Sequence, residues 1–218
     1  MDDSNLIRQI SGSILPLLFA ITMHEVAHGW AALLLGDRTA ARMGRLSLNP
    51  VHHIDPVGTL LVPALSYAIG GFLFGWAKPV PVSFGKLRQP RRDMALVALA
   101  GPMANLAMAM AWALMVRVAD AVAIPAVTEP LHYMGVQGIG INLLFMLLNL
   151  LPIPPLDGGR IVSALLPPRL SYRYGAIEQY GMWVLLVLIM VPGLLSAILG
   201  PPMTLMGGLM SLLAGLAG

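Results

Sequence analysis

The stretch that decides the fold is LIRQISGSILPLLFAITMHEVAHGWAALLL, residues 6–35, a long apolar run in which three ionisable side chains, His24, Glu25 and His28, lie within five residues. A run of this length can cross a bilayer core of roughly 30 Å, which needs about 20 apolar residues. Histidines four positions apart share one helix face, so His24 and His28 can bind one metal ion with Glu25 beside it. Elsewhere such a pair is often just a buried, satisfied pair, but in a membrane helix it needs a metal or a water-lined cavity.

The composition is that of an integral membrane protein. Of 218 residues, 57% are hydrophobic and 11% are charged, and the mean hydropathy is +0.79. The net charge of +3 fits loops beside anionic lipid, and no basic, aromatic-rich patch indicates nucleic-acid binding. Because the chain has no cysteine, a zinc site must use histidine and carboxylate ligands. We expect an all-α protein in the lipid bilayer, with residues 1–218 forming a single membrane-embedded domain.

Several apolar segments are long enough to cross the membrane. They are residues 6–35, 57–76, 94–119, 136–153 and 180–199, with a shorter candidate at 202–217. Basic loops flank 57–76 on both sides, so a full crossing would place one of them outside, against the positive-inside rule. Pro63 and the Gly70-Gly71 pair also weaken a continuous helix there. We therefore predict that 57–76 is a re-entrant hairpin.

With this hairpin, the basic loops share one side of the membrane. Residues 36–93 and 156–176 are then cytoplasmic, and 120–135 form an outer loop that starts just after Arg117 and contains no Lys or Arg of its own. This topology predicts a multi-pass protein of the cell membrane. It brings the His24–His28 turn and the turn at 156–159 to the same cytoplasmic end.

Asp157 is the best candidate for a third metal ligand. A catalytic zinc ion usually has three protein ligands and a water, and the first helix supplies only two. Asp157 follows the prolines that end the 136–153 segment, and the glycines at 158 and 159 would let the backbone aim its carboxylate into the bundle. The alternative is an ordinary capping or turn aspartate.

Five motifs in order, within residues 20–165, indicate a family. They are His24-Glu25-x-x-His28, Asn49-Pro50-x-x-His53-Ile54-Asp55-Pro56, Gly75-Trp76-Ala77-Lys78-Pro79-Val80-Pro81-Val82, Ala100-Gly101-Pro102-x-Ala104-Asn105 and Asn149-Leu150-Leu151-Pro152-x-Pro154-x-Leu156-Asp157-Gly158-Gly159. Together they resemble the site-2 proteases, intramembrane zinc metalloproteases that cut transmembrane substrates. The resemblance implies a catalytic core of three helices, which the charge-based topology also predicts. The segments at 180–199 and 202–217 have no charged residue, so we expect them to be lipid-facing support helices. It further implies regulated intramembrane proteolysis of single-span proteins.

The expected mechanism uses one Zn²⁺ ion held by His24, His28 and Asp157. The ion would lower the pKa of its water to about 7, and Glu25 would take the proton as general base. The resemblance implies that Asn149 and Asn105 hold the substrate or stabilise the oxyanion, although both could simply bond neighbouring helices.

Other motif residues receive weaker interpretations. His53, at the mouth of the hairpin, could support a metal ligand or gate access, but a loop histidine near the membrane surface needs no special role. The segment 76–84, which includes Lys78, Pro79, Val80, Pro81 and Val82, suits an edge strand because its prolines lack donors. We expect an unwound substrate to add to this strand; a proline-stiffened loop is the alternative.

Functions other than proteolysis are compatible with the same residues. The same histidine and aspartate site could serve a transporter or a metal-binding membrane protein that hydrolyses nothing. A catalytically dead family member is disfavoured because none of the three ligands or the base is missing. The length leaves no room for a PDZ-type periplasmic domain or a C-terminal regulatory domain, so the compact form of the family is expected.

Overall fold

The computed structural model describes the chain except residues 1–2, 63–64, 66–77, 123 and 217–218, and what it describes is helical, with no strand in those residues. The longer helices are α1 (Asp3–Leu34), α4 (Pro90–Val122), α5 (Pro125–Asn149), α6 (Asp157–Leu165), α7 (Pro168–Gly175), α8 (Glu178–Met190) and α9 (Leu194–Ala214). Short helical turns are α2 (Thr39–Arg42), η1 (Pro50–His53), η2 (Pro56–Leu61) and η3 (Phe84–Lys86). Within the described part of the chain, four helices are apolar and long enough to cross a membrane: α4, α9, Gly12–Leu34 of α1 and Val127–Asn149 of α5.

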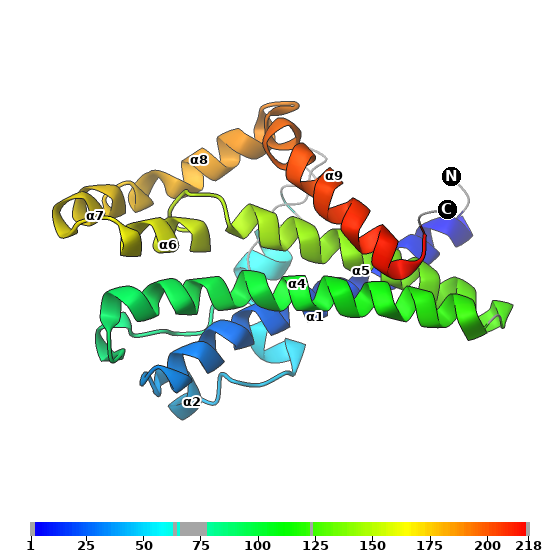
Figure 1. Ribbon diagram of the computed structural model, residues 1–218, viewed down its shortest axis with the longest axis horizontal. Coiled ribbons are helices and arrows are strands. Elements are labelled where there is room, and N and C mark those ends of the chain that lie inside the picture. Colours follow the sequence, from blue (N-terminus) through cyan, green and yellow to red (C-terminus); the bar gives the residue numbers. More distant parts are fainter. Residues whose placement is uncertain (1–2, 63–64, 66–77, 123, 217–218) are drawn as a thin grey trace.

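Helix α4 lies at the centre and packs against α1, α5, α6 and α9 (Figure 1). Its buried residues recur every three or four positions, so they form one stripe along the helix. Half of them are Gly or Ala, and residues such as Gly101, Ala109 and Ala113 allow neighbouring backbones to approach closely. The largest apolar cluster joins this stripe to α5 and α9, through residues such as Leu143 and Met210. The predicted bundle is therefore confirmed as a set of helices around α4.

Two predicted segments have different bounds in the structure. The outer loop predicted at 120–135 is mostly helical, because α5 begins at Pro125, where a missing N–H costs no helical hydrogen bond. The predicted span 180–199 is wrong. Helix α8 ends at Met190, and Gly193, with φ of 80°, separates it from α9. Helix α9 (Leu194–Ala214) takes the place of the short candidate span at 202–217.

The predicted hairpin at 57–76 falls mainly on residues outside the described ones. The described part of the predicted edge strand, residues 78–84, contains no strand: residues 78–83 have no regular secondary structure, and Phe84 begins η3. The segment is held by the end of α1: Asp37 accepts hydrogen bonds from the Ser83 N–H at 2.6 Å and from the Thr39 N–H at 2.9 Å. This anchor fixes the segment beside α1.

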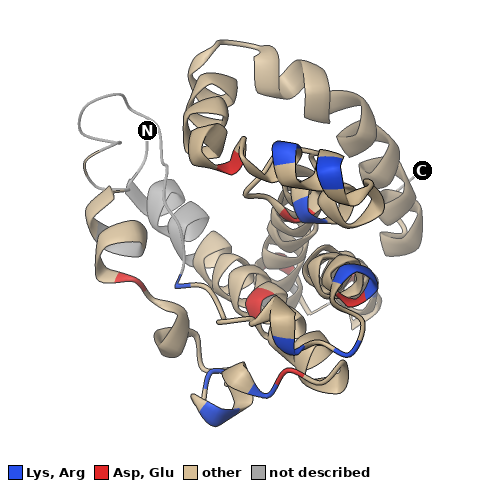
Figure 2. Ribbon diagram, turned by 90° about the vertical axis from the view of Figure 1, so that its left-hand side faces the viewer, with Lys and Arg blue, Asp and Glu red and all other residues tan. Residues whose placement is uncertain are grey.

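Basic residues gather at one end of the molecule, where α2, the start of α4, α6 and α7 lie (Figure 2). They include Arg42 in the last turn of α2 and Arg173 in the last turn of α7. A single basic end is what the positive-inside rule requires of loops on the same side of a membrane.

Candidate metal centre

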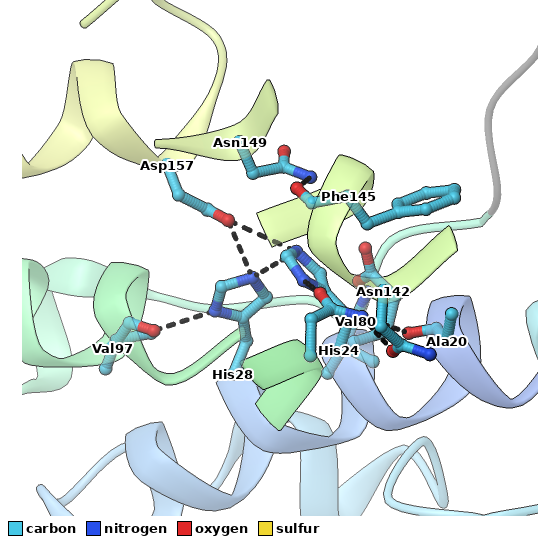
Figure 3. A network of polar contacts seen from close by, with 11 residues as sticks. Ala20, His24, His28, Val80, Val97, Asn142, Phe145, Asn149 and Asp157 are labelled. Atoms are coloured by element: carbon cyan, nitrogen blue, oxygen red, sulfur yellow. Dashed lines mark hydrogen bonds and ion pairs between the residues drawn. The ribbon is translucent and has the colours of Figure 1, made fainter. Parts of the chain in front are cut away.

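Three side chains from two distant parts of the chain meet between α1, α4 and α6. The Nε2 atoms of His24 and His28 lie 3.0 Å apart. Oδ2 of Asp157 lies 3.1 Å from the first nitrogen and 3.3 Å from the second. The three side chains are only 8–12% exposed, and they point toward one another (Figure 3).

The hydrogen bonds on the far side of each ring fix which nitrogen carries hydrogen. His28 Nδ1 lies 2.7 Å from the Val97 carbonyl oxygen, which can only accept, so Nδ1 donates. His24 Nδ1 lies 2.6 Å from Oδ1 of Asn105, which can likewise only accept. In the neutral rings, both Nε2 atoms therefore present lone pairs to each other and to Asp157.

This arrangement fits a metal ion. Oδ2 of Asp157 is buried and accepts no hydrogen bond, because its contacts to the histidines lack hydrogen-bond geometry. Two lone pairs and a carboxylate that converge in a buried place require a cation between them. Ligand atoms of a tetrahedral zinc ion lie roughly 3.3–3.6 Å apart, close to the separations found here.

A chain of buried amides holds the His24 ring. The Nδ2 group of Asn105 donates to the Ala20 carbonyl at 3.1 Å and to Oδ1 of Asn142 at 2.9 Å. Asn142 in turn donates to the Gly138 carbonyl of its own helix, and both asparagines are fully buried. Because Nδ2 of Asn105 has two acceptors, its Oδ1 must face His24. These hydrogen bonds therefore connect α5, through Asn105 on α4, to the His24 ring on α1 (Figure 3).

Gly101 lets α4 lie directly against the histidines. A Cβ atom at this position would come within 2.4 Å of His28 Nε2 and 2.6 Å of His24 Cε1. No side chain fits there without moving the rings. The close packing of α4 on α1 thus depends on one missing methyl group.

Asp157 is positioned by the way α6 begins. It is the first residue of α6 and caps no helix, since Leu156 is the capping residue and makes no side-chain bond. Gly158 and Gly159 lie within the helix, so they are not needed for the turn that was predicted. They are needed for close approach: a Cβ on Gly158 would lie 2.2 Å from the Leu150 carbonyl oxygen, and one on Gly159 would lie 2.5 Å from Pro154 N.

Glu25 faces the same cavity, which has a volume of about 330 Å³. Its Oε2 accepts a hydrogen bond of 2.8 Å from the Val80 N–H. Pro79, Val80 and Val82 line one wall, so most of the predicted substrate segment reaches the cavity, whereas Lys78 and Pro81 do not line it.

The remaining predicted residues are placed differently. Asn149 lines the cavity and donates a hydrogen bond to the Phe145 carbonyl of its own helix. Asn105 is buried behind His24 and does not line the cavity. His53 is buried in η1, where its Nε2 donates to the Ser47 carbonyl at 2.9 Å, and it does not line the cavity. The structure gives His53 a local bonding partner, and its proposed gating role stays a prediction.

Sequence reasoning missed Asn142, Gly101 and Asp37. Asn142 had a visible signal, because it is a polar residue in the apolar run of α5. Gly101 lies in the quoted Ala-Gly-Pro motif but received no role. Asp37 looked like an ordinary loop residue, and only its contact with Ser83, 46 positions along the chain, shows what it does.

Comparisons with known proteins agree with this site. A family model described as Peptidase family M50 matches residues 113–192. YwhC of Bacillus subtilis (strain 168), a protein named as a zinc metalloprotease, is 39% identical over 182 residues, which cover 82% of this chain and 80% of the relative. Two proteins that are both named as the zinc metalloprotease Rip2, from Mycolicibacterium smegmatis and Mycobacterium tuberculosis (strain H37Rv), are 32% and 34% identical to this chain. The aligned residues cover 66% of each of these two relatives.

No solved structure matches the chain. The similarity to YwhC extends over most of both chains, and the region matched by the family model contains Asp157 and all of α5 and α6. The chain therefore belongs to peptidase family M50.

Proposed function

We propose that the chain is an intramembrane zinc endopeptidase that hydrolyses peptide bonds of single-span membrane proteins. The observation that carries the proposal is the convergence of His24 Nε2, His28 Nε2 and Asp157 Oδ2, with Glu25 in the same cavity. Three ligands of this type leave a fourth position for water, which is the pattern of catalytic rather than structural zinc sites. Membership of a peptidase family agrees with that chemistry.

In this mechanism, each residue has a separate task. His24, His28 and Asp157 hold the ion, and zinc when bound supplies Lewis acidity toward the scissile carbonyl and makes water nucleophilic at neutral pH. Glu25 is adjacent to the ligands without being one, so it takes the proton from water and passes it to the leaving amine. We assign Asn149 a contact with the substrate backbone, because it lines the cavity. Asn105 acts on His24 and not on the substrate.

We further propose that an unwound substrate lies along Pro79–Val82. The segment is neither helical nor paired in a strand, and it borders the cavity beside Glu25. Its prolines donate no hydrogen bonds, and Lys78 donates its N–H to the His53 carbonyl, so pairing would use the backbone of Val80 and Val82. Photocrosslinkers placed at positions 78–84 should capture a bound substrate; adducts confined to other parts of the cavity would contradict this path.

We place the protein in the cell membrane with the active site toward the cytoplasm. The basic end of the molecule supports this orientation, since loops rich in Lys and Arg stay on the cytoplasmic side. Cysteines introduced at exposed Arg42 and at Ile124, which precedes α5, should label from opposite sides of the membrane. Labelling of both positions from the same side would contradict the arrangement.

The deciding experiment compares the wild type with Glu25→Gln. Each is co-expressed with candidate single-span proteins, and each purified protein is tested for zinc content. Glu25→Gln keeps the ligands but cannot accept a proton, so it should bind zinc and substrate and cut nothing. Glu178→Gln, the same change at an exposed site on α8, should cut like the wild type. Cleavage by Glu25→Gln at the wild-type rate would exclude Glu25 as the base.

A further inference from the structure

Arg160 is the one cation that lines the cavity, within the described part of the chain, and the mechanism does not use it. It lies on α6 one turn after Asp157, so both side chains emerge from the same helix face. Its guanidinium lies over the Phe84 ring, 5.3 Å from the ring centroid. Phe84 also lines the cavity, two residues after the segment proposed to hold the substrate.

No carboxylate among the described residues pairs with this guanidinium, and its only recorded partner is the Phe84 ring. The lining combines apolar side chains, such as Val82, Val97 and Leu156, with the polar groups of the metal site. A guanidinium that no carboxylate of the protein neutralises can bind an anionic group of a ligand. The planar guanidinium, already oriented by stacking, matches a carboxylate with two parallel hydrogen bonds.

We propose that Arg160 is a specificity residue that binds an acidic side chain of the substrate close to the cleaved bond. This inference rests on the proposed function of the cavity. Residues three apart on a helix have Cβ atoms about 5–6 Å apart, which equals about two residues of an extended peptide. The acidic residue should therefore lie within about three residues of the cleaved bond.

The test uses the full chain in detergent and a substrate whose cleavage point has been mapped. Glu, Gln or Lys is placed in turn at each of the three positions on either side of the cleaved bond. At one position, the wild type should cleave the substrate with Glu at a kcat/KM about 10–100-fold above that of the substrate with Gln, because Gln cannot form the charge-assisted hydrogen bond. Arg160→Gln should remove that preference, and Arg160→Glu should favour Lys there.

Matched controls separate this effect from damage to the protein. Arg169→Glu makes the same change at an exposed position on α7 that does not line the cavity, so it should keep the wild-type preference. Zinc content and the thermal midpoint of each variant show whether the site and the fold are intact. An Arg160→Glu protein that still prefers Glu over Lys would overturn the proposal. An equal loss of rate on every peptide would overturn it too, because Arg160 would then act on the reaction and not on selection.

A binding measurement keeps the inference distinct from the proposed function. If no variant cleaves any peptide, proteolysis as the function fails. The affinities of Glu and Gln peptides for Glu25→Gln protein, with and without Arg160→Gln, still decide the role of Arg160. Tighter binding of the Glu peptide that depends on Arg160 supports the proposal, and equal binding refutes it.

Discussion

Substitution of Gly101 by alanine tests whether the missing side chain of α4 makes room for the metal ligands. The added methyl would lie 2.4 Å from His28 Nε2, whereas an ordinary contact is about 3.4 Å or more. The ring must therefore move by roughly 1 Å, and zinc sites tolerate only about 0.2 Å in ligand distance. Loss of a supporting contact alone lowers metal affinity about 10–100-fold. Displacement of a ligand itself should cost at least about 100-fold.

The assay is a competition between purified protein in detergent and a zinc-binding dye. Gly140→Ala is the matched control, because it adds the same methyl to α5 where no atom lies within 4 Å. It should bind zinc like the wild type. Gly135→Ala controls for crowding away from the site, since its methyl would collide with the Val116 side chain on α4. It should lower the thermal midpoint while zinc affinity is largely kept. Zinc affinity of Gly101→Ala within threefold of the wild type would refute the reasoning.

Three further predictions concern the supports of the site. Asn105→Ala removes the acceptor that orients His24, so zinc affinity measured by dye competition should fall about 10–100-fold; an unchanged affinity would argue against the relay. Gly158→Ala places a methyl 2.2 Å from a backbone oxygen, so the thermal midpoint should drop by several degrees, and a wild-type midpoint would show that α6 can shift freely. Burial opposes ionisation of Asp37, but hydrogen bonds from Thr39 and Ser83 lower the pKa of its carboxyl. The resulting stability is present above the unfolded-state pKa and is lost as pH falls through the lowered folded-state pKa, from about pH 5 downward. Asp37→Asn should thus have a lower thermal midpoint than the wild type at pH 6, and its midpoint should fall less steeply as the pH is lowered below about 5. A midpoint equal to that of the wild type both at pH 6 and at acid pH would contradict this.

The sequence was sufficient for features that depend on local pattern. The apolar length of α1, the four-residue spacing of His24 and His28, and the proline-ended segment before Asp157 are all visible in single stretches, and the structure brings these residues together. The ends of the C-terminal helices were not predicted, because the break at Gly193 lies inside a continuous apolar run that hydropathy reads as one segment.

Contacts between distant residues could not be predicted. The hydrogen bond from Asn105 to Asn142 joins residues 37 positions apart, and it forms only because α4 and α5 pack with these two side chains facing each other. The hydrogen bond between Glu25 and Val80 joins positions 55 apart. Nothing in either local sequence distinguishes these partners from other polar groups, so only the packing of the helices identifies them.

The bond between Glu25 and Val80 has a consequence for timing. A backbone N–H donates one strong hydrogen bond at a time, and the Val80 N–H donates its bond to the carboxylate that must later accept a proton. A peptide carbonyl that pairs with Val80 would displace the carboxylate from this donor and free Oε2 of Glu25 to accept a hydrogen bond from water. Arrival of the substrate and release of the base would then be a single event, and without substrate Oε2 would stay bonded to Val80.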